Sequence, residues 1–337
     1  MPLLLGSHEA FERHDTGRFH PERPARLGAV LRGVASARVA EEVVSFAPRP
    51  ATAAELEAVH APAYLAELRR ICTADCSQLD PDTVAVPASY EAALRSAGAG
   101  LEAVDRLRRG EGEAAFLAVR PPGHHALSYR AMGFCLLNNV AVTAAALRAA
   151  GERVAIVDWD AHHGNGTQEI FYEDPAVLYV SIHQWPFYPG TGSVDETGAG
   201  AGLGATLNLP FPAGTGGEAY RQAFDEVVSP VVEAHQPDWV LVSAGFDAHR
   251  ADPLTDLGLT AGDFADLMAK SAALAPPGRR IAFLEGGYDL AALELSVRAA
   301  LDSLGGVLSR PEPVSGPAPA DEAAGAVVAS ARHLHLG

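Results

Sequence analysis

Short apolar runs without polar alternation recur along this chain, and they restrict its fold more than any other feature. A run that is apolar on both faces is typical of a strand buried on both sides of a sheet. The Leu-rich segment at residues 3–5 predicts one such strand, at the start of the chain. The other runs, rich in β-branched residues, lie at 42–47, 115–120, 154–160, 177–183, 205–210, 239–244 and 281–285.

Helical segments alternate with these runs, which predicts an α/β domain. Helical periodicity is clearest at 90–109, 138–150, 217–235 and 261–274. Alternating strands and helices form a mostly parallel sheet, here of about eight strands, with helices on both faces. No repeat or composition break divides residues 1–308, so we expect one domain there. Residues 309–337 have prolines at positions 311, 313, 317 and 319, which predict a stiff linker, followed by a short helix at 321–333.

The charge balance excludes some classes of partner. The 337 residues include 42 acidic and 25 basic side chains, a formal net charge of -17. Non-specific binding to nucleic acid or to an anionic membrane needs a cationic surface, so neither partner is expected. Three cysteines and an N-terminus without a basic, long apolar leader favour a reducing, cytoplasmic location.

Carboxylates and a histidine follow the apolar run at 154–160. Residues two apart share a face in extended backbone, so Asp158, Asp160 and His162 are predicted to lie in one row. Two buried carboxylates at that spacing repel each other unless a cation or hydrogen-bond donors lie between them. A helix cap would explain one aspartate but not the row. We therefore expect a metal or ion site here.

Other strand ends carry residues that complete such a site. Asp247 follows the run at 239–244, and as a third ligand it would leave an open position for water, as a catalytic zinc requires. The pair His124-His125 follows a stiff Pro-Pro-Gly turn and is typical of acid–base groups. Tyr288 follows two glycines, and its phenol would donate a hydrogen bond to a developing oxyanion.

Together these segments resemble the zinc-dependent histone deacetylase family, which includes acetylpolyamine amidohydrolases and bacterial deacetylase-like amidohydrolases. The resemblance implies the single-domain arginase/deacetylase-type α/β fold and covers residues 14–305. The matching segments, in order, are HxxGxxHPExPxRL at 14–27, PPGHH at 121–125, DxDxHHGNG at 158–166, GFD at 245–247 and EGGY at 285–288.

The resemblance implies two kinds of metal site. One zinc ion per active site would be held by Asp160, His162 and Asp247. A structural potassium ion would be held by the Asp158 carboxylate, the Ser181 hydroxyl and backbone carbonyls that include those of Asp158, Asp160, His162 and Ile182.

The resemblance also implies catalytic roles. His125 is the expected general base and acid, and His124 is its electrostatic partner, hydrogen-bonded to Asp158. Tyr288 is the expected donor to the substrate carbonyl. Asn165 stands where class I members have Asp and class II members have Asn, and this neutral partner makes His125 less easily protonated.

Four further residues are implied to contact the substrate. Phe134 and Tyr188 resemble the walls of an acyl-lysine tunnel, and Gly133 would offer its carbonyl to the substrate amide. Leu254 stands where the polyamine-specialised animal branch has a gatekeeper Glu, which favours an acyl-lysine substrate.

The sequence thus predicts a zinc-dependent amidohydrolase that removes an acyl group, most simply acetyl, from acylated lysine in a peptide or protein or from a small acylated amine. An acetylpolyamine amidohydrolase is the nearest alternative. A two-manganese ureohydrolase of the arginase type would need more carboxylates. A catalytically silent module that binds acyl-lysine would have no use for both His125 and Tyr288. No feature predicts the oligomeric state.

Overall fold

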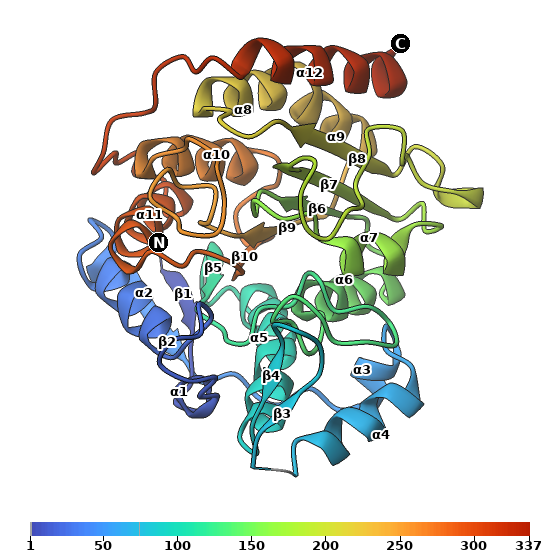
Figure 1. Ribbon diagram of the computed structural model, residues 1–337, viewed down its shortest axis with the longest axis vertical. Coiled ribbons are helices and arrows are strands. Elements are labelled where there is room, and N and C mark those ends of the chain that lie inside the picture. Colours follow the sequence, from blue (N-terminus) through green and yellow to red (C-terminus); the bar gives the residue numbers. More distant parts are fainter. Residues whose placement is uncertain (1, 74) are drawn as a thin grey trace.

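The computed structural model describes residues 2–73 and 75–337, and a parallel sheet forms its centre. The sheet has eight strands in the order β2-β1-β5-β10-β9-β6-β7-β8 (Figure 1), and every pair of neighbours is parallel. Its strands are β1 (Leu3–Gly6), β2 (Val43–Phe46), β5 (Ala114–Leu117), β6 (Val154–Asp158), β7 (Val177–Gln184), β8 (Thr206–Phe211), β9 (Trp239–Ala244) and β10 (Arg280–Leu284).

The burial of these strands explains why apolar runs in the sequence predicted them. Every residue of β5, β6, β7, β8 and β9 is buried, because helices cover both faces of the sheet. The predicted fold class is therefore confirmed. A two-stranded hairpin of β3 (Ser77–Gln78) and β4 (Val84–Ala85) lies outside the sheet and was not predicted.

The helices form a layer on each face of the sheet (Figure 1). On one face, α5 (Ser89–Arg108) packs against α6 (Asn139–Ala149), and on the other α11 (Leu290–Leu304) packs between α2 (Ala25–Ala35) and α10 (Ala261–Ala273). The other α-helices of the described residues are α1 (Ala10–Arg13), α3 (Ala53–Glu57), α4 (Pro62–Ile71), α7 (Asn165–Phe171), α8 (Gly217–Ala223), α9 (Ser229–His235) and α12 (Asp321–Leu336), and single 3-10 turns lie at Ala40–Glu42 and Gly200–Gly202. None of the helices within the described part of the chain is long and apolar enough to cross a membrane.

Two expected elements differ in detail from those observed. The strand expected at 154–160 ends at Asp158, and the backbone bends where a strand would have continued. The helix expected at 217–235 is divided by a π-helical turn, Phe224–Val228, between α8 and α9. Pro230 lies in the first turn of α9, where its missing N–H interrupts the regular helical ladder.

The C-terminal segment is docked on the domain. The helix expected at 321–333 is α12, which packs against α8 and β8 and buries Ala324, Val328 and Ala331. The extended segment before it is also held in place, because the Glu312 carboxylate accepts hydrogen bonds from the backbone N–H of Ala261 and from side chains of the loop that follows β9.

Candidate active site

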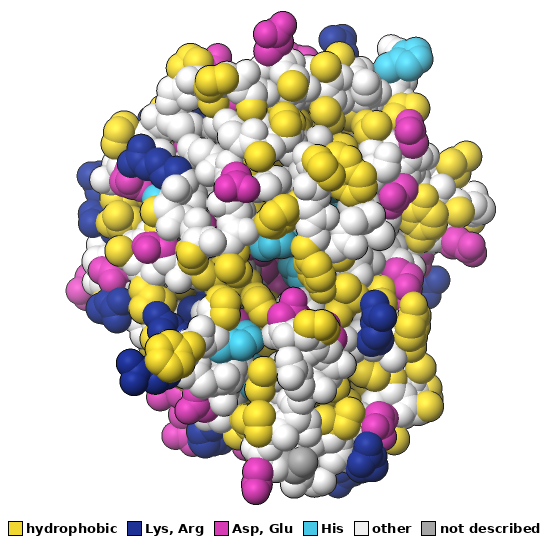
Figure 2. Space-filling model, viewed as in Figure 1, with side chains coloured by type: hydrophobic (Ala, Val, Ile, Leu, Met, Phe, Trp, Pro, Cys, Tyr) yellow, Lys and Arg dark blue, Asp and Glu magenta, His cyan; other side chains and the backbone are white. Residues whose placement is uncertain are grey.

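The residues predicted to bind metal or to take part in catalysis lie together at one edge of the sheet. The strands β5, β10, β9 and β6 are neighbours in the sheet and parallel, so the loops after them meet at their carboxyl ends. A cavity of about 760 Å³ opens there, and Figure 2 shows histidine side chains at its floor with hydrophobic side chains around it. It is lined by Thr16, Gly17, Arg18, Phe19, His20, Pro21, Pro81, Asp82, His125, Gly133, Phe134, His162, Tyr188, Leu254 and Tyr288.

Asp160, His162 and Asp247 form a cluster of potential metal ligands at this floor. His162 Nδ1 lies 2.9 Å from Asp247 Oδ2 and 3.2 Å from Asp160 Oδ1. The donor atoms of a tetrahedral zinc site are about 3.3 Å apart, which follows from zinc–ligand distances of about 2.0 Å. One nitrogen and two carboxylate oxygens within 4.8 Å of one another fit a divalent cation, and three protein ligands leave a fourth tetrahedral position open.

Backbone donors hold the two carboxylates of this cluster. The N–H of Gly286 donates to Asp160 Oδ2 at 2.8 Å, and the N–H of Ala161 donates to Asp247 Oδ1 at 2.8 Å. A Cβ atom at position 286 would lie 2.4 Å from Asp247 Oδ2, so glycine is required for this approach. Gly286 thus lets the backbone after β10 approach both carboxylates closely.

The protonation of the cluster shows how its charges compete. Burial and the Asp160 carboxylate raise the pKa of Asp247 to about 7. Burial lowers the pKa of His162, but hydrogen bonds to Asp160 and Asp247 outweigh it and raise that pKa to about 10. Without a cation, these groups therefore hold protons near neutral pH, and a divalent cation would compete with them.

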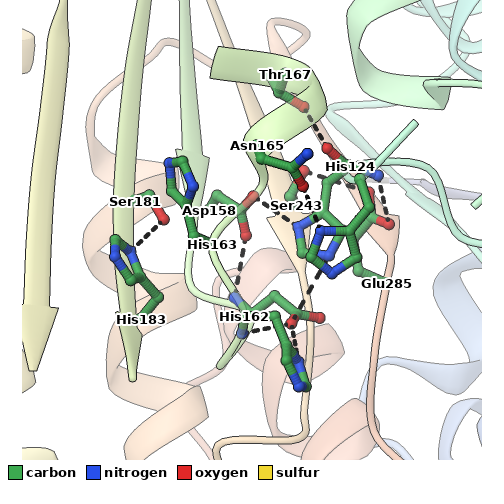
Figure 3. Close-up of polar contacts among 12 residues, drawn as sticks. His124, Asp158, His162, His163, Asn165, Thr167, Ser181, His183, Ser243 and Glu285 are labelled. Carbon is green, nitrogen blue, oxygen red and sulfur yellow. Dashed lines mark hydrogen bonds and ion pairs between the residues drawn. The ribbon is translucent and has the colours of Figure 1, made fainter. Parts of the chain in front are cut away.

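Asp158 points away from that cluster, which corrects the predicted row of three side chains. Because the strand ends at Asp158, the following turn directs Asp160 and His162 elsewhere. The Asp158 carboxylate instead contacts His124 Nδ1 at 3.0 Å and accepts a hydrogen bond from Tyr179 at 3.1 Å, as Figure 3 shows for the histidine. Burial lowers the pKa of His124, but Asp158 and then Asp160 raise it to about 10.

His125 lies beside His124 with the opposite electrostatic character. Its Nδ1 lies 2.8 Å from Asn165 Oδ1, an acceptor, so Nδ1 carries the proton and Nε2 is left as the basic nitrogen. Burial lowers the pKa of His125 well below its usual range, and the positive charges of His124 and His162 lower it further. The lowered pKa keeps His125 neutral, so Nε2 is free to accept a proton, and it would need a water molecule whose own pKa is lowered, as a metal ion would lower it.

Aromatic side chains line the channel above the floor. The ring centroid of Phe134 lies 5.7 Å from that of Tyr288, and the ring of Tyr188 lies 5.3 Å from that of His125. Gly133 and Phe134 both have positive φ angles, 55° and 67°. At position 133 a Cβ atom would lie 2.4 Å from the His125 ring, so only glycine fits. Leu254 lines the same cavity.

The residues expected at a potassium site also lie together. Asp158 on β6 is the direct neighbour of Ser181 on β7, and Ile182 is the next residue of that strand. All three side chains are buried. The Ser181 hydroxyl lies 2.9 Å from His183 Nδ1, a contact drawn in Figure 3.

Sequence reasoning gave no role to a second group of buried charges behind the cavity. Glu22 accepts hydrogen bonds from Arg26 and Arg120, and Arg26 also donates to the carbonyl of Gly287 at 2.7 Å. The Arg26 guanidinium lies 5.0 Å from the ring centroid of Tyr288. Arg26 and Glu285 both belong to segments that resemble the family. The position of Glu285, an acidic residue at the end of an apolar run, was the sequence feature that could have indicated a buried role.

Comparison with known proteins relates the chain to one family. The histone deacetylase domain family matches residues 20–304. A probable deacetylase of Archaeoglobus fulgidus is 42% identical over 289 residues, which cover 84% of this chain and 80% of that protein. A histone deacetylase-like amidohydrolase of Pseudomonas aeruginosa is 39% identical over 295 residues, 86% of this chain and 77% of that protein.

A solved structure extends the likeness to the whole fold. The crystal structure of the HDA15 HD domain superposes with a TM-score of 0.91 at 36% sequence identity, and the match covers 99% of this chain and 94% of that one. The family match spans most of the chain and includes every strand-end segment that forms the cavity floor. This chain belongs to the histone deacetylase family.

Proposed function

We propose that this protein is a zinc-dependent deacylase that removes an acetyl group from N-acetyl-lysine in a peptide or protein. The observation that carries the proposal is the floor of the cavity, where a metal-ligand cluster, the neutral imidazole of His125 and the phenol of Tyr288 face one space. A bare binding module would need no neutral base beside a metal site. Two aspartates and one histidine also fit other divalent metals. We propose zinc because catalytic zinc sites have three protein ligands and one open tetrahedral position.

The side chains divide the reaction among them. A bound metal ion would polarise the substrate carbonyl and lower the pKa of a water molecule. His125 Nε2 accepts a proton from that water as its oxygen attacks the carbonyl carbon, and then returns a proton to the departing amine nitrogen. Tyr288 donates a hydrogen bond to the carbonyl oxygen as negative charge develops there. His124, held protonated by Asp158, adds positive charge beside the reacting atoms.

We also propose a structural potassium ion and a cytoplasmic location for this protein. A potassium ion beside Asp158 and Ser181, with backbone carbonyls of Asp160, His162 and Ile182, would offset the buried carboxylate charge next to the metal ligands. All three cysteines are free thiols, which supports a reducing, cytoplasmic environment.

The channel supports an acyl-lysine substrate over a polyamine. Phe134 and Tyr188 form walls that suit an alkyl chain, and Leu254 adds an apolar side chain at the cavity. The acetylpolyamine alternative has one specific observation in its favour, the Asp82 carboxylate that also lines the cavity, since it would pair with a second amine of the substrate.

A substrate screen tests this choice. We expect a higher kcat/KM for acetyl-lysine peptides than for N-acetylputrescine, and loss of both activities with a chelator. Replacing Leu254 with Glu should raise the ratio of polyamine to peptide kcat/KM by about tenfold, because a carboxylate at the channel would attract the distal amine. Faster hydrolysis of N-acetylputrescine by the unaltered protein would replace the acyl-lysine proposal with the polyamine one.

The neutral partner of His125 predicts a pH effect. In Asn165→Asp a carboxylate would face Nδ1 and raise the pKa of His125, so that the base would be lost at a higher pH. The acid limb of the pH profile of kcat/KM should therefore move upward by about one pH unit or more. In the unaltered protein that limb should lie below about pH 6.5, the usual histidine pKa. An acid limb that does not move in the variant would remove His125 from the role of base.

A further inference from the structure

Glu285 is a buried carboxylate to which the proposed reaction gives no role. It follows β10 directly and is fully buried, with 0% of its surface exposed. Its Oε2 accepts hydrogen bonds from the backbone N–H of Gly123 at 2.7 Å and of His124 at 3.2 Å. Its Oε1 accepts a third from the Ser243 hydroxyl at 3.3 Å (Figure 3). The side chain thus links the ends of β9 and β10 to the turn that carries the two histidines.

The donors to this carboxylate are all uncharged. Arg26 approaches the same residue but donates to its backbone carbonyl, not to its side chain. Burying a carboxyl group on neutral donors costs free energy that an apolar side chain of similar volume would avoid. Burial accordingly raises the pKa of Glu285 to about 7. In either protonation state one carboxyl oxygen still accepts from the N–H groups of Gly123 and His124. This pair of hydrogen bonds, here called the anchor, therefore does not depend on the charge of Glu285.

Glu285 accepts from the N–H groups of Gly123 and His124, whose carbonyls accept from the N–H groups of Ala126 at 3.0 Å and Thr167 at 3.1 Å. The rest of the turn is fixed by other groups, since Ser96 bonds the carbonyl of Arg120 and Asn139 bonds that of Pro121. The bonds from Gly123 and His124 to Glu285 lie at the next two residues. They end one residue before His125, whose ring Nδ1 is held by Asn165.

We propose that Glu285 is a positioning residue of the hydrolytic reaction, whose carboxyl group fixes the backbone of Gly123 and His124 and thereby sets the placement of the general base His125. The inference rests on the proposed deacylase function. A displacement of about 1 Å at a reacting group can cost about 10²-fold in rate, so an anchor one residue from the base affects the chemical step. It lies behind the floor of the cavity and should leave substrate affinity unchanged.

Two variants of similar volume isolate the anchor. Glu285→Gln keeps an oxygen for the two N–H groups and turns its amide toward the Ser243 hydroxyl, which can accept. Glu285→Met fills a similar volume and offers the two N–H groups only a weakly accepting thioether sulfur. We expect kcat to fall by roughly 10- to 100-fold in E285M, with KM within about twofold, and to stay within about threefold in E285Q. Zinc stoichiometry should be unchanged in both, because neither alters a ligand.

Amide hydrogen exchange supplies a readout that is independent of activity. Exchange of the backbone amides at 123–126, measured by mass spectrometry on the full chain, should accelerate in E285M and match the unaltered protein in E285Q. If the unaltered protein hydrolyses no acylated amine, the proposed function fails, while this comparison still tests the anchor. Unchanged exchange in E285M would overturn it.

Further outcomes decide the proposal. Equal kcat losses in E285M and E285Q would show that charge, not the hydrogen bonds to the turn, matters, and would overturn it; so would a change in KM alone. Ser243→Ala removes only the bond to Oε1 and should cost less than about threefold in kcat. If E285M does not fold by circular dichroism, Glu285→Asp decides, since it retracts the carboxylate by one methylene. A fall in kcat at constant KM supports the anchor, and unaltered kinetics overturn it.

Discussion

Replacing Asp247 with alanine should remove stoichiometric metal binding and lower kcat/KM by more than about 10³-fold, since metal polarisation is worth several kcal/mol in the transition state. Asp247 Oδ2 lies 2.9 Å from His162 Nδ1, and the remaining Asp160–His162 pair would hold a divalent ion weakly. Metal content is measured by elemental analysis after dialysis, and activity on an acetyl-lysine peptide with zinc restored.

A second aspartate on the same loop provides the matched control. Asp256 is exposed and outside the ligand cluster, and it contacts only Gln184 among the bonds described for its side chain. Asp256→Asn should keep one metal ion per chain and near-normal activity. Full activity of the Asp247 variant with no bound metal would contradict the metal-dependent proposal as a whole.

Metal binding should also depend on pH in a direction that the cluster dictates. In the metal-free protein the pKa of Asp247 is raised to about 7 and that of His162 to about 10, so protons compete with the cation. Both groups lose protons as pH rises, and apparent metal affinity should therefore increase with pH across that range. This explains why the Asp247 comparison is best made at one fixed pH of about 8, where competition at Asp247 is small.

The strands of the sheet could be predicted because parallel strands buried on both faces consist of continuous apolar runs. The run at 239–244 has the same bounds as β9, and all eight strands were expected. The order of the strands was not predictable. β10 lies between β5 and β9. Its pairing with β5 joins residues more than 160 positions apart in the sequence, and a local pattern carries no information about such a contact.

The site was predictable in content but not in geometry. Periodicity of two placed Asp158, Asp160 and His162 on one face, yet that periodicity ends with the strand at Asp158. The turn beyond it separates a carboxylate for His124 from the ligand cluster. The contacts of Glu285 could not be predicted either. They are made with backbone N–H groups of a distant turn, and backbone groups are the same whatever the sequence.

Replacing Tyr288 with phenylalanine should lower kcat by about 10²-fold or more and leave KM and zinc content nearly unchanged. The ring would keep its place, because the backbone N–H of Tyr288 donates to Asp252 at 2.7 Å and Arg26 lies 5.0 Å from the ring centroid. Only the hydroxyl is removed. Burial raises the pKa of Tyr288 well above its usual range, so the phenol stays protonated and able to donate at any working pH.

The other tyrosine of the channel separates this role from mere loss of a hydroxyl. Tyr188 lines the same cavity but is 38% exposed, and Tyr188→Phe should change kcat by less than about threefold. A donor that acts only as charge develops on the carbonyl oxygen affects kcat, whereas a group that contacts the bound substrate equally throughout affects KM. Unchanged kcat in Y288F, or a loss shared equally by Y188F, would therefore show that the oxyanion is stabilised by other groups.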